Sequence, residues 1–216
     1  MKTGIGMFYA VGVGPGDPAW MTRQACDVLG FCPVIAAPRS ASGEMPALEV
    51  ARGAVDLSRK SIVPLKFTAA RARSARNAEY VRAASSIARV LDAGLSVAMV
   101  NLGDVSIYAT AYYVLDELRR RGYDTRMIPG VASFSAVAAA LGRSLTEMEL
   151  PLHIYPAGAS DLDAALAQPG TGERLFAFEN EQKAENEERN VNTKEKTVKN
   201  NCFTEEKDDD SYEYRY

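Results

Sequence analysis

Three short segments rich in glycine and small polar residues each follow an apolar run and precede an amphipathic one. They are residues 12–17 (GVGPGD), residues 101–110 (NLGDVSIYAT) and residues 128–135 (IPGVASFS). Glycine permits positive φ angles and lets the backbone approach a ligand closely, and amides at a helix N-terminus can meet a polar ligand group. Each segment alone is compatible with a simple turn. Together they indicate a ligand held by backbone groups at several strand ends.

Asp104 stands beside Gly103 at the predicted end of an apolar strand, where open α/β sheets bind their ligands. Its carboxylate could accept hydrogen bonds from a ligand amine or from ribose hydroxyls. Alternatively, Asp104 caps the helix that follows. The first segment departs from the GxGxxG dinucleotide fingerprint, because its third glycine comes two residues after the second and Pro15 removes one amide. A nicotinamide cofactor is therefore disfavoured.

Apart from an arrangement built on His153, the sequence offers no Ser-His-Asp or Cys-His set for nucleophilic chemistry and no cluster for a metal. His153 is the single histidine, and it lies in an apolar run, where a structural role is favoured. The three cysteines, Cys26, Cys32 and Cys202, form no CxxC pair, so we predict neither a metal site nor a disulfide framework. The residues suit a reaction that depends on positioning its reactants, such as methyl transfer from a sulfonium. No catalytic side chain is predicted.

Apolar runs alternate with amphipathic segments along the chain, which is typical of an α/β fold with a mostly parallel sheet. Strands are predicted at residues 7–14, 34–37, 62–66, 97–102, 125–128 and 152–155. Helices are predicted at residues 23–29, 46–55, 77–93, 111–121 and 133–141, with Thr22 as the N-cap of the first.

We expect an N-terminal α/β domain at residues 1–122, a partial C-terminal α/β domain at residues 123–178 and a charged tail at residues 179–216. The tail is rich in Lys, Asn and Glu and has almost no aliphatic residues, so it cannot bury enough apolar surface to offset its ordering entropy. We expect it to be disordered; an exposed charged helix is the alternative.

Charge and hydropathy bear on the expected partners and on the expected location of the protein. A net charge of −3 gives no reason to expect a nucleic-acid partner. No stretch reaches the roughly 18–20 apolar residues of a membrane span. The first residues lack the apolar core and cleavage site of a signal peptide, so we expect a cytoplasmic protein.

The three segments, in this order, resemble the tetrapyrrole (corrin/porphyrin) methylase family, which has a GxGPGD loop, a GDxxxYxT loop and a PGxxSF segment. Within that family, residues 36–44, 102–110 and 151–154 are similar to the branch that methylates C-20 of precorrin-2. The resemblance covers residues 7–171. Because the tail departs from the family pattern, we interpret the second domain as truncated or chimeric.

The resemblance implies a two-domain tetrapyrrole methylase fold, usually homodimeric, that binds S-adenosylmethionine, or its product S-adenosylhomocysteine, between the domains. The implied reaction adds a methyl group to C-20 of precorrin-2 or cobalt-precorrin-2 in cobalamin biosynthesis. Methylation at another corrin-ring position, or an inactive remnant that only binds the cofactor, are the alternatives.

The family's cofactor contacts carry over onto the three segments of this sequence. They fall on Pro15 in the first segment, on Leu102, Gly103, Asp104, Ile107, Tyr108 and Thr110 in the second, and on Ala132 and Ser133 in the third. The substrate carries many carboxylates, which a guanidinium binds with two parallel hydrogen bonds. Arg39, between Pro38 and Ser40, is our candidate for that contact.

Overall fold

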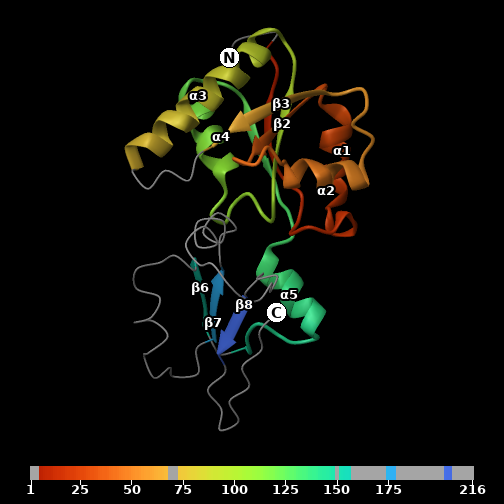
Figure 1. Cartoon of the computed structure of the whole chain (residues 1–216), viewed down its shortest axis with the longest axis vertical. Helices are drawn as coiled ribbons and strands as arrows, with labels where there is room; N and C mark the ends of the chain where they lie inside the picture. Colours follow the sequence, from red (N-terminus) through yellow and green to blue (C-terminus); the bar gives the residue numbers. More distant parts are fainter. Residues whose placement is uncertain (1–4, 68–72, 149–150, 157–173, 179–201, 206–216) are drawn as a thin grey trace. The chain divides into compact units, whose positions relative to one another are not determined.

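The computed structural model describes residues 5–67, 73–148, 151–156, 174–178 and 202–205 (Figure 1). The chain divides into two compact units, Met1–Ser133 and Phe134–Tyr216, and each is described by itself. Among the described residues, no helix combines the length and apolarity needed to cross a membrane.

The first unit is built on a parallel sheet of five strands. In chain order these are β1 (Phe8–Gly12), β2 (Val34–Arg39), β3 (Ser61–Lys66), β4 (Val97–Asn101) and β5 (Thr125–Ile128). Their order across the sheet is β3-β2-β4-β1-β5. The central strand β4 is buried along its whole length, as expected for a sheet covered on both faces.

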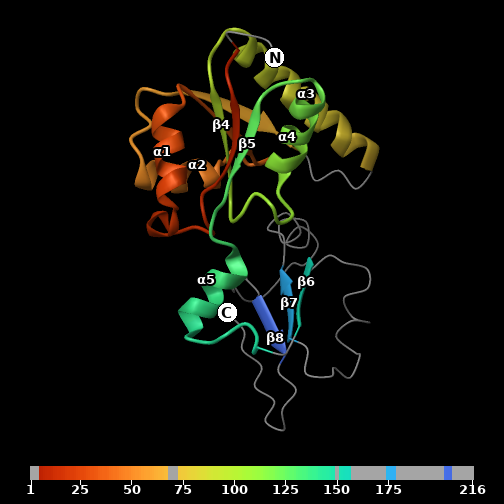
Figure 2. The ribbon, with the colours of Figure 1, turned by 180° about the vertical axis from the view of Figure 1, so that it is seen from behind.

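Helices cover both faces of this sheet (Figures 1 and 2). One face carries α1 (Arg23–Phe31) and α2 (Pro46–Ala54), and the other carries α3 (Arg73–Asp92) and α4 (Thr110–Arg120). A short 3-10 helix, η1 (Pro18–Trp20), follows β1 and has Asp17 as its N-cap. The prediction of an α/β fold is confirmed.

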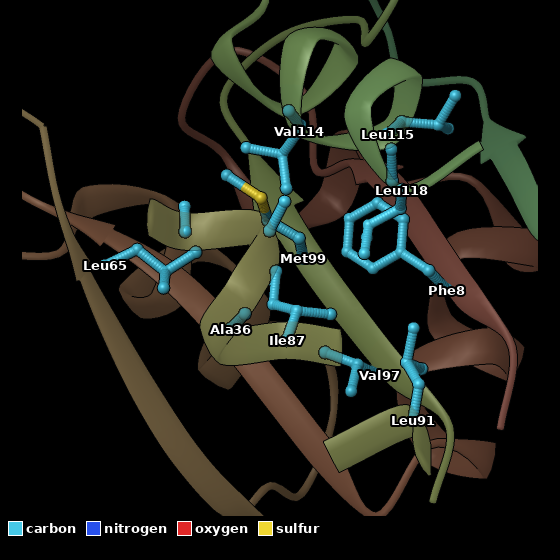
Figure 3. Close-up of a cluster of buried hydrophobic side chains, with 14 of the residues drawn as sticks. Phe8, Ala36, Leu65, Ile87, Leu91, Val97, Met99, Val114, Leu115 and Leu118 are labelled. Carbon is cyan, nitrogen blue, oxygen red and sulfur yellow. The ribbon is translucent and has the colours of Figure 1, made fainter. Parts of the chain in front are cut away.

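Alternation along the strands divides the core into two layers. Phe8 and Ala10 of β1 and Val97 and Met99 of β4 face α3 and α4, whereas Val11 faces α1 and α2. The first layer is shown in Figure 3, where Phe8 of β1, Met99 of β4 and Val114 and Leu118 of α4 belong to one buried cluster. These side chains are fully or almost fully buried. Such burial contributes about 1.5–3 kcal/mol for each large apolar side chain.

The connections leave the two central strands in opposite directions. The chain passes from β1 through α1 to β2, which lies beyond β4, whereas it passes from β4 through α4 to β5, which lies beyond β1. A topological switch point therefore lies between β1 and β4. In open α/β sheets, ligands bind at such a point, outside the carboxyl ends of the strands.

Most predicted elements are found close to their expected bounds. Thr22 caps α1, since its hydroxyl accepts a hydrogen bond from the Ala25 amide at 3.1 Å. Helix α3 begins at Arg73, before the expected residue 77. The boundary expected at residue 122 differs from the division after Ser133, because β5 pairs with β1 and so belongs to the first sheet.

The second unit contains a sheet of three strands. Strand β6 (Leu152–Pro156) pairs in parallel with β7 (Arg174–Phe178), and β7 pairs antiparallel with β8 (Cys202–Glu205). Helix α5 (Ser133–Leu141) begins at the last residue of the first unit. The charged tail, expected to be disordered, includes β8; the remainder of residues 179–216 lies outside the described residues.

Candidate functional site

The three glycine-bearing segments begin where strands β1, β4 and β5 end, along the carboxyl-terminal edge of the parallel sheet. Gly12, at the end of β1, pairs in register with Asn101, at the end of β4, and Val11 pairs with Ile128, at the end of β5. The chain leaves all three strands at this edge, on both sides of the switch point. The segments are therefore called loop 1 (residues 13–17), loop 2 (residues 102–109) and loop 3 (residues 129–132).

Loops 1 and 2 are joined by a pair of backbone hydrogen bonds. The Gly103 amide donates to the Gly14 carbonyl oxygen at 2.8 Å, and the Gly14 amide donates to the Gly103 carbonyl oxygen at 3.3 Å. The φ angles are +78° at Gly14 and +67° at Gly103, in the region that favours glycine. Both glycines are therefore required for this bridge across the switch point.

Loop 3 packs at Gly130 against the end of β1 at Gly12 and against loop 2 at Gly103. A Cβ atom placed on Gly12 would lie 2.7 Å from both the Gly103 carbonyl oxygen and the Gly130 amide nitrogen. A Cβ atom on Gly130 would collide with the same Gly103 oxygen and with the Gly12 backbone. Glycine at these positions lets the three backbones meet without side chains between them.

The carboxylate of Asp104 ties loop 2 to loop 3. Its Oδ2 accepts a hydrogen bond from the Gly130 amide at 2.8 Å, and its Oδ1 accepts one from the Ser106 amide at 2.7 Å and another from the Ser106 hydroxyl. Burial raises the pKa of Asp104, but the hydrogen bonds from Ser106, Gly130 and Val105 outweigh burial and hold that pKa below its usual value.

The structure excludes one of the two interpretations of Asp104 that the sequence left open, that of a helix cap. Helix α4 begins at Thr110, and its N-cap is Ala109, so Asp104 does not cap that helix. Its carboxylate instead fixes the relative position of two loops. A ligand at this edge would meet a charged group that is already held in place.

A second contact that fixes loop 3 comes from Thr22, which the sequence marks only as a helix cap. Its hydroxyl also donates to the Pro129 carbonyl oxygen of loop 3 at 3.3 Å. Thr22 therefore joins the start of α1 to loop 3. No feature of the sequence relates residue 22 to residue 129, because this contact exists only once β1 and β5 are paired.

The structure brings the predicted cofactor contacts of the first unit to one edge. Pro15, Leu102, Ile107, Thr110, Ala132 and Ser133 are half-buried, and so are Gly103 and Asp104. Tyr108 is 60% exposed, and its φ of 49° is the one positive value at a non-glycine residue among the described residues. Such backbone strain concentrates at functional sites. The binding role of these residues stays a prediction.

Arg39 lies at the carboxyl end of β2, at the same edge of the sheet but beyond β4. Its Nε donates to the Gly43 carbonyl oxygen at 3.2 Å. Within the described part of the chain, no group of three or more His, Cys, Asp and Glu residues could hold a metal ion. The site can therefore supply backbone amides, half-buried apolar side chains and an oriented carboxylate.

The family model of the tetrapyrrole (corrin/porphyrin) methylases matches residues 7–200 of this chain. The chain belongs to this family. The match extends past residue 171, where we expected the family pattern to stop, and reaches into the charged tail. Membership explains why three loops of this composition occur in one short chain.

Curated relatives of this family member include methyltransferases of two corrin positions. It is 34% identical, over 69% of its length, to a probable cobalt-precorrin-2 C(20)-methyltransferase of Methanocaldococcus jannaschii, and the alignment covers 64% of that protein. It is 32% identical, over 63% of its length, to a precorrin-4 C(11)-methyltransferase of a Sinorhizobium species, of which 47% is covered. The chain thus spans less than two thirds of either relative.

Solved structures of tetrapyrrole methylases share the fold. A putative cobalamin synthesis related protein from Corynebacterium diphtheriae superposes with a TM-score of 0.61 at 20% identity, covering 80% of this chain and 72% of that one. A cobalt precorrin-4 methyltransferase superposes with a TM-score of 0.56 at 21% identity, covering 80% and 68%. At these identities the likeness establishes the fold.

Proposed function

We propose that this tetrapyrrole methylase is an S-adenosylmethionine-dependent C-methyltransferase that adds a methyl group to C-20 of precorrin-2 or cobalt-precorrin-2, and that it acts as a homodimer. The observation that carries the proposal is the junction of three glycine-bearing loops at the switch point of the sheet, tied together by Asp104. The M. jannaschii relative, whose printed activity concerns C(20), supports the choice of ring position.

The residues at this edge fit the cofactor that the family resemblance implies. Gly12 and Gly130 pack against neighbouring main chain and so draw the loops together, whereas Gly103 has open space at its Cβ position. Leu102 and Ile107 offer half-buried apolar side chains to an adenine ring. We propose that Pro15, Leu102, Gly103, Asp104, Ile107, Tyr108, Thr110, Ala132 and Ser133 hold the cofactor.

When bound, S-adenosylmethionine supplies an electrophilic methyl group on a sulfonium. The contribution of this chain is positional: the loops hold the ligand in one orientation, and their half-buried apolar residues exclude water from it. Proper alignment of two reactants is worth several kcal/mol of the barrier, on the order of 7–11 kcal/mol for ideal cases. Arg39 orients the macrocycle by binding one of the macrocycle's carboxylates.

A second candidate function is methylation at C-11 of precorrin-4. It is favoured by the 32% identity to the Sinorhizobium C(11)-methyltransferase, close to the 34% identity to the C(20) relative. Both candidates need the same cofactor site and differ in the acidic macrocycle that is presented to it and in the ring carbon that receives the methyl group.

Calorimetric titration with S-adenosylmethionine, followed by incubation with precorrin-2 and with precorrin-4, tests the proposal. We expect binding in the micromolar range and a mass increase of one methyl group on precorrin-2, with the new methyl assigned to C-20 by NMR. Turnover of precorrin-4 alone would move the assignment to the second candidate. Binding without turnover of either macrocycle identifies a remnant that keeps only the cofactor site, and absence of binding refutes the cofactor assignment.

A further inference from the structure

Two cations lie side by side at the carboxyl edge of the sheet. Arg39 ends β2 and Lys66 ends β3, and the two residues are register partners in the parallel pair β2–β3. Neighbouring strands are about 4.8 Å apart. Register partners in a sheet point to the same face, so both side chains leave the sheet on one side.

The face that carries the two cations follows from alternation along the strands. Ile35 and Ala37 of β2 are buried in the layer beneath α1 and α2, and Ile62 of β3 packs against the same layer. Arg39 lies two residues after Ala37, and Lys66 lies four residues after Ile62. Both cations therefore project on the α1/α2 face, beyond the apolar layer, and both are exposed.

Neither cation has an acidic partner among the described residues, since no ion pair within 4 Å involves Arg39 or Lys66. The nearest carboxylate along the chain, that of Glu44, accepts a hydrogen bond from the Ser42 hydroxyl at 3.2 Å. Like charges directly opposite each other on neighbouring strands are destabilising. The arrangement thus has a cost in the folded chain that a bound dianion would remove.

The turn after β2 holds one of the two cations in place. The Gly43 carbonyl oxygen accepts a hydrogen bond from Arg39 Nε, and the φ of Gly43 is +98°. A Cβ atom on Gly43 would lie 3.2 Å from Arg39 Nη2. The turn therefore leaves the terminal nitrogens of the guanidinium available while it restricts the side chain.

We propose that Arg39 and Lys66 together bind two carboxylates of the acidic macrocycle, with Lys66 as a specificity residue that the sequence did not reveal. This inference rests on the proposed function, because it assigns a place to that function's polycarboxylate substrate. The pair lies beyond β4, on the far side of β4 from loop 1, so the carboxylates would be held apart from the cofactor loops. A polycarboxylate can form a charge-assisted hydrogen bond with each of the two cations, whereas a neutral macrocycle can form none.

The test compares binding of uroporphyrin III, a stable tetrapyrrole polycarboxylate, with binding of S-adenosylmethionine in the full chain. The variants are Lys66→Met, Lys66→Arg and Arg39→Gln. The matched control is Arg59→Gln, an exposed cation before the start of β3, at the opposite edge of the sheet. Fluorescence titration measures porphyrin affinity at several salt concentrations, and calorimetry measures cofactor affinity.

We expect Lys66→Met and Arg39→Gln each to weaken porphyrin binding roughly tenfold and to reduce its salt dependence, because each removes one charge-assisted contact. Lys66→Arg and Arg59→Gln should bind as the unaltered chain does, and cofactor affinity should stay constant throughout. The melting temperature of Lys66→Met should equal or exceed that of the unaltered chain, since one of two opposed charges is gone.

Equal porphyrin affinity in Lys66→Met and Arg59→Gln would overturn the inference while leaving the proposed function standing. An unaltered chain that binds S-adenosylmethionine but no porphyrin would also overturn it. Failure of the proposed function would give a different result: the unaltered chain itself would neither bind S-adenosylmethionine nor methylate a macrocycle.

Discussion

The carboxylate of Asp104 lies 2.8 Å from the amide nitrogen of Gly130, although the two residues are far apart in sequence. This single contact crosses the end of β1 and links the loop that follows β4 to the loop that follows β5. Together with the Gly14–Gly103 bridge, it makes the candidate cofactor site one assembled surface instead of three separate turns.

Asp104→Asn should loosen this surface. The amide group of Asn presents one oxygen and one NH2 group where the carboxylate presented two acceptors, so either the Gly130 or the Ser106 contacts are lost. The expected loss of unfolding free energy is about 1–3 kcal/mol. Urea denaturation measures it, and calorimetry should show S-adenosylmethionine binding at least roughly tenfold weaker.

The same variant has a predicted pH signature. Because the pKa of Asp104 is held below its ordinary value of 3.8, its contribution to stability is present above that value and is lost as pH falls through the folded-state pKa. On acidification below about pH 4, the Asp104→Asn variant should therefore lose less free energy of unfolding than the unaltered chain does. The control is Asp27→Asn, which removes an exposed pair with Arg23 at 3.8 Å; similar acid profiles for both variants would contradict the assignment.

Gly12→Ala should disrupt the junction of the three loops. The added methyl group would lie 2.7 Å from main-chain atoms of Gly103 and Gly130, so the backbones must separate. Overpacking of this kind costs about 1–3 kcal/mol. Gly30→Ala is the matched control, because Gly30 lies in α1 with open space at its Cβ, and alanine there should stabilise by roughly 0.5–1 kcal/mol. Thermal unfolding of both variants checks the opposite signs.

Arg121→Lys should weaken the packing of α4 against α3. The guanidinium pairs with Glu117 at 2.8 Å and also donates to the Ser85 hydroxyl at 2.9 Å and to the Val81 carbonyl oxygen at 3.3 Å. An ammonium cannot reproduce this planar set, so a loss of about 1–2 kcal/mol is expected. Arg120→Lys, whose pairs lie within α4 alone, should change stability by less than about 0.5 kcal/mol in the same urea titration.

Cys32 should resist alkylation in the folded chain. Burial raises the pKa of its thiol to about 11, and Lys60 opposes that rise only in part. Iodoacetamide at pH 8 should therefore modify half-buried Cys26 before buried Cys32, as read by peptide mass spectrometry. Labelling of Cys32 as early as Cys26, without unfolding, would show that the core around Cys32 opens to solvent.

The raised pKa of Cys32 also makes stability fall with alkali. Between pH 9 and about pH 11 the Cys32 thiol keeps its proton in the folded state but loses it in the unfolded state, where its pKa is near 9.0. The contribution of Cys32 to the free energy of unfolding is therefore full below pH 9 and is lost as pH rises toward about 11. A Cys32→Ala variant should show a flatter pH dependence in that window. An unchanged slope would assign the alkaline transition to other groups.

Local pattern was enough to locate most elements of the first unit. The predicted strand at residues 125–128 is confirmed without change as β5, and the Thr22 cap of α1 is confirmed. Helix α3 begins before its predicted start because residues 73–76 lack apolar periodicity, so nothing local marks them as helical. The short helix η1 was missed, since a three-residue element leaves no periodic trace.

The glycine and small-residue loops and the alternation of apolar runs are properties of the sequence by itself, because they depend only on neighbours along the chain. The order of the strands, the bridge from Gly14 to Gly103, the tie from Asp104 to Gly130 and the pairing of Arg39 with Lys66 belong to the tertiary structure. The physical reason is that a register between strands distant in sequence is set by the burial of two whole faces at once, and no single segment carries that information.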